Sequence, residues 1–107
     1  MRWLTFVYFA HALRDDLLTD EDWQRIEWQL IVNPHAGSVI AGTGGARKLR
    51  VRLAGRGKRG GARMVYVYLT GRERIYFLAT YAKNEQEDLS PADQRVIARL
   101  IERLRQE

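Results

Sequence analysis

The fold is decided by residues 48–82, which read KLRVRLAGRGKRGGARMVYVYLTGRERIYFLATYA. Residues 48–53 alternate strictly between cationic and apolar side chains, so they predict a strand with one cationic and one buried face. Residues 63–69 and 74–82 are rich in β-branched and aromatic side chains, and the short connection Thr70-Gly71-Arg72-Glu73 favours a hairpin between them. The stretch therefore predicts three consecutive strands, with a glycine-rich loop, residues 54–61, between the first and the second.

Capped amphipathic helices are predicted on both sides of this stretch. Thr19 can cap a helix whose first turn carries three acids, and Pro34 disfavours helical geometry at Asn33, where the helix ends. Ser90 and Pro91 start a last helix as its N-cap and first residue. The apolar stripes that these helices should bury are Trp23, Ile26, Leu30 and Ile31 in one, and Val96, Ile97, Leu100, Ile101 and Leu104 in the other.

The N-terminal third completes the predicted order of elements. Residues 3–9 are bulky and apolar enough for a strand buried on both faces, residues 10–18 predict a short helix, and residues 35–45 predict a loop. The resulting order, β-α-α-β-β-β-α, indicates the α+β class, with two N-terminal helices and one C-terminal helix packed on a small, mostly antiparallel sheet. A length of 107 residues suits a single domain that spans residues 1–107.

Positive charge is concentrated in the middle of the chain. From Trp28 to Arg72 there is no Asp or Glu but there are nine Lys or Arg residues, and because the whole chain carries +5, subtracting these nine leaves −4 elsewhere. Surfaces that serve only solubility intersperse the two signs. The segregation favours a binding surface for a polyphosphate such as nucleic acid, and the alternative is a solvated basic face without a partner.

Two glycine-rich segments match the residue patterns of nucleotide-binding loops but lack the flanking features that these loops need. Residues 55–60, GRGKRG, have the spacing of a dinucleotide-binding loop, but a strand follows them and no acid stands about 20 residues further on. Residues 42–48, GTGGARK, resemble a phosphate-binding loop, but Leu49 occupies the place of the Ser or Thr that would hold magnesium. Both segments are therefore interpreted as turns between strands.

Several classes of function are disfavoured by composition. The absence of cysteine rules out disulfides, thiolate zinc sites and a cysteine nucleophile, and His11 and His35 show no metal-ligand spacing, so we expect no metal and no other cofactor. There is no run of about 18 apolar residues and no signal peptide at the start of the sequence. These features predict a cytoplasmic protein without membrane contacts.

The chemistry that remains is metal-independent RNA cleavage. The 2′-OH of the substrate attacks the adjacent phosphate, so the protein must supply cations around the developing charge and groups that move protons. Lys48, Arg50 and Arg63 suit the first task, and they converge if the strand that begins at Arg63 pairs with residues 48–52. RNA phosphates are also the expected partners of the other cations of this segment, Arg47, Arg52, Arg56, Lys58 and Arg59.

Aromatic residues at alternate strand positions leave two interpretations open. Tyrosines can stack on unpaired bases, and they can equally fill the core between a sheet and its helices. The tyrosines concerned are Tyr66, Tyr68, Tyr76 and Tyr81.

Three segments together resemble the HigB branch of the RelE/ParE toxin superfamily. They are residues 42–50 (GTGGARKLR), 57–63 (GKRGGAR) and 81–85 (YAKNE). The resemblance covers nearly the whole chain and implies the RelE fold and the toxin half of a type II toxin–antitoxin pair. It further implies an mRNA endonuclease that cuts codons in the ribosomal A site and inhibits translation. The implied partners are mRNA on the ribosome, rRNA and a neutralising antitoxin with a helix-turn-helix domain, through which alone DNA would be contacted.

The resemblance also implies roles for single residues. Lys48 and Arg50 match the strand that binds RNA phosphates, Arg63 matches the arginine that stabilises the transition state, and Lys83 and Asn84 follow the last strand, where the family places catalytic groups. The family carries an arginine and then a tyrosine base there, whereas this chain has Asn84 and Ser90, so Tyr81 or Lys83 becomes the candidate base. The alternative function is that of a non-catalytic, ParE-like toxin that binds nucleic acid or gyrase.

Overall fold

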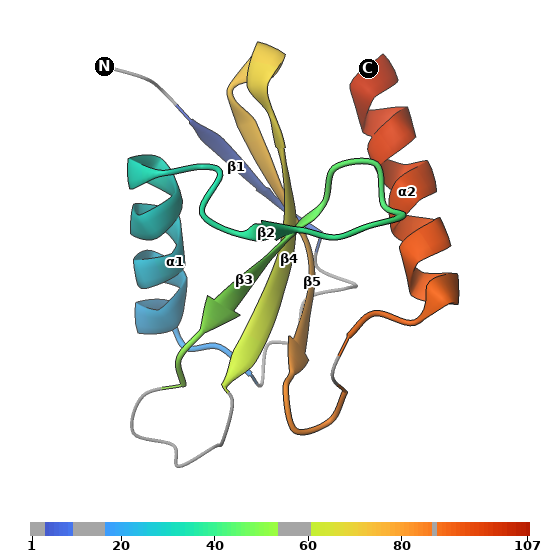
Figure 1. Ribbon diagram of the computed structural model, residues 1–107. Helices are drawn as coiled ribbons and strands as arrows, with labels where there is room; N and C mark the ends of the chain where they lie inside the picture. Colours follow the sequence, from blue (N-terminus) through green and yellow to red (C-terminus); the bar gives the residue numbers. More distant parts are fainter. Residues whose placement is uncertain (1–3, 10–16, 54–60, 87) are drawn as a thin grey trace.

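The computed structural model describes residues 4–9, 17–53, 61–86 and 88–107, in which two helices pack on opposite faces of one five-stranded sheet (Figure 1). In chain order the elements are β1 (Thr5–Tyr8), α1 (Asp20–Val32), β2 (Ser38–Val39), β3 (Arg47–Val51), β4 (Ala62–Leu69), the 3₁₀ turn η1 (Thr70–Arg72), β5 (Arg74–Ala82) and α2 (Pro91–Gln106). None of the helices in this part of the chain is long and apolar enough to cross a membrane.

The strands lie in the order β1-β5-β4-β3-β2. Neighbours from β2 to β5 are antiparallel, and only β1 runs parallel to its neighbour, β5. The predicted α+β class with a mostly antiparallel sheet is thus confirmed. Strand β4 lies at the centre and is buried along its whole length, as expected of a strand covered on both faces.

Each face of the sheet is covered by one helix. Ile26 and Leu30 of α1 pack on the face that includes Leu49, Val51 and Met64. Helix α2 covers the other face, where Ile97, Ile101 and Leu104 pack against Val65, Val67, Leu69, Tyr76 and Leu78. The alternation predicted for residues 48–53 is confirmed: Leu49, Val51 and Leu53 are buried, whereas Lys48 is half-buried and Arg50 and Arg52 are exposed.

The predicted helix starts are also confirmed. The Thr19 hydroxyl accepts a hydrogen bond from the Asp22 N–H at 3.1 Å, and the Asp22 carboxylate accepts one from the Thr19 N–H at 2.9 Å, which is a capping box. The Ser90 hydroxyl accepts a bond from the Asp93 N–H at 3.1 Å, with Pro91 at the first helical position.

Three local expectations need correction. Strand β1 is only half-buried, because it lies at the edge of the sheet. Ser38 and Val39, expected in a loop, form a short strand that pairs with β3. Ile31 and Val96 are 45% and 63% exposed, since each lies at the margin of its apolar stripe. The helix expected over residues 10–18 lies mainly outside the described residues and stays a prediction; Leu17 and Leu18, which are described, are not helical.

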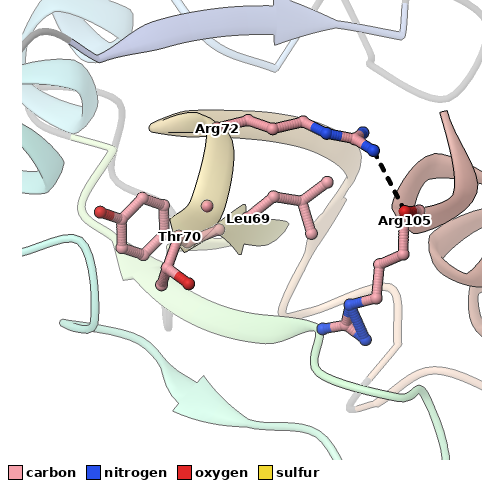
Figure 2. A pocket seen from close by; sticks show the side chains of 6 residues that line it. Leu69, Thr70, Arg72 and Arg105 are labelled. Carbon is pink, nitrogen blue, oxygen red and sulfur yellow. Dashed lines mark hydrogen bonds between the residues drawn. The ribbon is translucent and has the colours of Figure 1, made fainter.

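Two arginines connect the C-terminal end of α2 to the rest of the molecule by hydrogen bonds. Arg72 of η1 donates to the carbonyl oxygens of Leu104 and Arg105, and Figure 2 shows its side chain reaching the helix end across a pocket. Arg105 in turn donates to the Gly44 carbonyl at 2.9 Å. Cations are favoured at helix C-termini, where carbonyl groups lack helical partners. Gly45 has a φ of +125°, which residues with a side chain rarely adopt, so this position favours glycine.

Candidate nucleic-acid interface

The register of β3, β4 and β5 brings three predicted site residues into one row. Arg50 pairs with Arg63, and Arg63 pairs with Tyr81. Residues opposite each other in a sheet point to the same face, which here is the face covered by α2. Lys48, two residues before Arg50, points to that face as well. The expected convergence of Lys48, Arg50 and Arg63, named here the cationic cluster, is therefore confirmed.

Two like charges face each other directly in this cluster. Arg50 and Arg63 carry the same charge, so they repel each other across the strand pair. Arg63 is only 7% exposed, and its Nη1 donates to the Ala62 carbonyl at 3.2 Å. A partly desolvated guanidinium interacts more strongly with an anion than an exposed one does. The geometry suits a phosphate between the two arginines.

A carboxylate that the sequence did not single out completes the cluster. Asp88 accepts a hydrogen bond from the Lys48 ammonium at 2.6 Å. The pKa of Asp88 is lowered mainly by this hydrogen bond and by the charge of Lys48, with smaller contributions from Lys83 and Arg63. Asp88 lies in a polar segment, and no pattern relates it to a strand forty residues earlier.

Tyr81 lies beside these charges but is held in its neutral form. Its ring is 4% exposed, and its hydroxyl has no hydrogen-bond partner among the described residues. Burial raises the pKa of Tyr81; Asp88 raises it further, and the opposing charges of Lys48 and Arg63 do not compensate. At neutral pH Tyr81 is thus a phenol, which can donate a hydrogen bond but does not readily accept a proton as a base.

The other tyrosines belong to the core. Tyr66, Tyr68 and Tyr76 are at most 8% exposed. The hydroxyl of Tyr66 accepts from the Gly37 N–H at 2.9 Å and donates to the Pro34 carbonyl at 2.8 Å. These contacts favour packing over base stacking for this group.

The segment after β5 returns toward the cluster. The Lys83 N–H donates to the Gly61 carbonyl at 3.0 Å, and Glu85 and Gln86 close a turn on the Ala82 carbonyl. The Gln86 amide then donates to the Asp88 carbonyl at 3.0 Å. Lys83 thus lies close enough to lower the pKa of Asp88. Asn84 is exposed in the turn, and no described contact joins it to the cationic cluster.

The remaining predicted RNA-binding residues are distributed differently. Arg47 donates to the carbonyl oxygens of His35, at 3.2 Å, and Gly37, at 2.7 Å, so it holds the loop before β2. Arg52 is exposed just beyond β3. Arg56, Lys58 and Arg59 lie outside the described residues.

The cationic cluster borders a depression at the margin of the sheet, lined by Gln29, Ala36, Ser38, Lys48, Leu49, Arg50 and Arg63. Within the described ranges, no three or more His, Asp or Glu side chains gather in a geometry that could hold a metal ion. What the site offers chemically is fixed positive charge, one phenol and one ionised carboxylate.

Comparison with known proteins identifies the family. The solved structure of an arginine-to-alanine double mutant of the Escherichia coli toxin RelE in the free state is similar in fold, with a TM-score of 0.55 and 14% sequence identity, covering 81% of this chain and 90% of that chain. Residues 1–106 match the family described as the RelE toxin of the RelE/RelB toxin–antitoxin system. Because this match spans nearly the whole chain, the protein belongs to the RelE toxin family.

Proposed function

We propose that this toxin is a HigB-like, metal-independent endoribonuclease that cleaves mRNA on the ribosome and thereby inhibits translation. The supporting observation is the direct opposition of Arg50 and Arg63 beside Lys48, because a phosphate would relieve the repulsion within this cluster. Membership of a toxin–antitoxin family implies an antitoxin partner. We expect the antitoxin to carry a helix-turn-helix domain and both proteins to act in the cytoplasm, where ribosomes work.

The proposed reaction is transesterification within the RNA. A bond forms between the 2′-oxygen and phosphorus, the bond from phosphorus to the 5′-oxygen breaks, and the products carry a 2′,3′-cyclic phosphate and a 5′-OH. Negative charge develops on the phosphate oxygens, where Arg63 is best placed to stabilise it because of its burial. Arg50 and Lys48 bind the same or the adjacent phosphate. We assign no proton transfer to Tyr81, because its hydroxyl is buried and its raised pKa keeps it neutral.

The proton of the 2′-OH needs an acceptor beside this cluster. Asp88 is the candidate because it is an exposed carboxylate beside the cluster. Its lowered pKa keeps it ionised at neutral pH and also makes it a weak base. Lys83 lies nearby and is placed to neutralise the carboxylate or to protonate the leaving 5′-oxygen. We therefore assign proton transfer to Asp88 and Lys83. Among the described residues no contact joins Asn84 to the cluster, and its catalytic role stays a prediction.

The chemistry of the cut ends tests this function. Purified toxin is added to a translating extract, and the new ends of a reporter mRNA are mapped and treated with enzymes that distinguish cyclic phosphates from free hydroxyls. The proposal predicts 2′,3′-cyclic phosphate and 5′-OH ends that appear only while ribosomes translate. Cleavage that leaves 5′-phosphate ends would contradict the mechanism. Arrest of growth without any mRNA cleavage would favour a non-catalytic toxin.

A further inference from the structure

A second depression lies between α1 and β3. It is lined by Asp22, Arg25, Ile26, Trp28, Gln29, Arg50, Val51 and Arg52, and is named here the Trp28 groove. Strand β2 pairs only with Arg47 and Lys48, so within the described residues the outer edge of β3 from Leu49 to Val51 has no strand beside it. Figure 1 shows α1 standing alongside this edge. The groove is thus bounded by a helix on one side and an open strand edge on the other.

The Trp28 groove is continuous with the cationic cluster. Gln29 and Arg50 line both this groove and the depression that holds Lys48 and Arg63. A chain bound at Arg63 therefore meets Arg50 next and can pass around the edge of β3 toward α1. The two depressions together form a path that leads out of the proposed reaction site.

Trp28 is an unusual residue at this position. It lies off the buried stripe of α1 and is 68% exposed. An exposed indole ring offers a flat apolar surface, which proteins that bind single-stranded nucleic acids use to stack bases. Ile31 and Val32 are also exposed on α1, but neither lines the groove.

The charge of the groove favours RNA as its ligand over a partner protein with a surface of mixed charge. The exposed side chains of Arg50 and Arg52 contact no carboxylate in the part of the chain that the structure describes. The acid that lines the groove, Asp22, is 2% exposed and already bonded to the Thr19 N–H and to Arg25. An exposed aromatic ring between exposed arginines suits a nucleotide, which combines a flat base with an anionic linkage.

We propose that the Trp28 groove binds one unpaired nucleotide of the RNA substrate next to the scissile step. Its base stacks on Trp28, and the phosphate that joins it to the scissile nucleotide is bound by Arg50. The Gln29 amide, which lies where the two depressions meet, faces the base edge or the sugar. This subsite rests on the proposed ribonuclease function and extends it. It selects single-stranded RNA in which the bound base can unstack from its neighbouring bases.

The test measures binding separately from cleavage. A labelled single-stranded oligoribonucleotide with 2′-O-methyl groups cannot be cut by 2′-OH attack, so its affinity is followed by fluorescence anisotropy. We expect Trp28→Ala to raise the Kd about tenfold or more and Trp28→Phe to restore most of the affinity, because stacking depends on an aromatic ring. The matched control is Val32→Ala, an exposed apolar residue of the same helix outside the groove, which leaves the Kd unchanged. Thermal unfolding checks that the variants fold.

A Kd for Trp28→Ala within twofold of the parent would overturn the proposal. If Trp28→Ala and Val32→Ala both weaken binding of the antitoxin and spare the RNA, the face belongs to a protein partner. The outcome is separable from that of the proposed function. If Trp28→Ala loses affinity but the parent protein does not cleave mRNA, the RNA subsite is supported and the ribonuclease function is contradicted. If Trp28→Ala keeps its affinity and the parent protein cleaves mRNA, only the subsite is contradicted.

Discussion

The ammonium of Lys48 lies 2.6 Å from the carboxylate of Asp88, forty residues further along the chain, and this ion pair joins β3 to the segment before α2. Asp88 thereby occupies a place beside the cationic cluster that an RNA phosphate would otherwise share. The pair lowers the pKa of Asp88, so the carboxylate remains ionised throughout the neutral range. We propose that Asp88 both accepts a proton from the substrate and competes with the substrate phosphate for Lys48.

Replacing Asp88 by Asn should therefore separate binding from catalysis. Freed from its carboxylate partner, Lys48 binds a phosphate more strongly, so KM falls and the slope of log affinity against log salt steepens by about 0.7. Loss of the proton acceptor lowers kcat by about 10²-fold or more. Cleavage kinetics at several salt concentrations check both effects. The exposed Asp93→Asn, at the start of α2, is the control; an unchanged kcat in Asp88→Asn would remove Asp88 from the reaction.

The same assignment predicts a pH dependence. Because the pKa of Asp88 lies below its ordinary value of 3.8, the carboxylate does not gain a proton until the pH falls below that value. Protonation of Asp88 should consequently cause no change in the cleavage rate between about pH 5 and 7. Single-turnover rates over this range provide the measurement. The lowered pKa would be contradicted if the cleavage rate of the parent protein fell tenfold per pH unit below pH 6 and the rate of Asp88→Asn did not.

Replacing Tyr81 by Phe should remove a buried hydroxyl that has no partner among the described residues. The free energy of unfolding near pH 7 then changes by less than about 1 kcal/mol. Tyr66→Phe, which removes two hydrogen bonds, costs about 1–3 kcal/mol and serves as the comparison. Urea unfolding at neutral pH distinguishes the two. A loss above about 2 kcal/mol in Tyr81→Phe would show that the hydroxyl is satisfied in the folded protein.

Alkaline pH gives an independent check on the pKa of Tyr81. Burial raises that pKa above 10.0, so the folded protein retains a proton that the unfolded chain releases. The stability that depends on this proton is fully present below pH 10 and is lost as the pH rises toward the folded pKa. The parent protein should thus lose more stability between about pH 9 and 11 than Tyr81→Phe does. Equal losses would mean that the pKa of Tyr81 is not raised.

The contact between Arg72 and the end of α2 should contribute to stability and not to RNA binding. Arg72→Ala removes hydrogen bonds to the carbonyl oxygens of Leu104 and Arg105 together with a cation at the helix end, which costs about 1–2 kcal/mol. Calorimetry should show a Tm lower by several degrees. Arg103→Ala, an exposed residue in the last turn of α2, is the matched control and should change stability by less than about 0.5 kcal/mol.

Local patterns predicted much of this fold, because they act within a few residues. The alternation over residues 48–53, the cap at Thr19 and the Ser90-Pro91 helix start all correspond to the structure. The convergence of Arg50 and Arg63 was predictable only as a consequence of strand pairing, which the register confirms. The margins of the stripes were not predictable, since Ile31 and Val96 have the right spacing and still face solvent.

Long-range pairings could not be predicted from the sequence. The parallel pairing of β1 with β5 joins the first and the last strand of the chain, and nothing in residues 5–8 specifies a partner about seventy residues away. The position of Asp88 depends on the turn after β5 and on the reach of Lys48, both of which are tertiary effects. The open edge of β3 became apparent only when β2 proved to be two residues long.

We infer that Arg63 stabilises the charge that develops on the phosphate during RNA cleavage. The most direct measurement is the single-turnover rate of mRNA cleavage in a translating system, for Arg63→Ala and for Arg99→Ala, which removes an exposed arginine of α2. We expect Arg63→Ala to cleave about 10²–10³-fold more slowly. Thermal unfolding of the variant checks that it remains folded. Arg99→Ala should cleave at the parent rate. A folded Arg63→Ala variant that cleaves as fast as the parent would show that Arg63 does not stabilise the transition state.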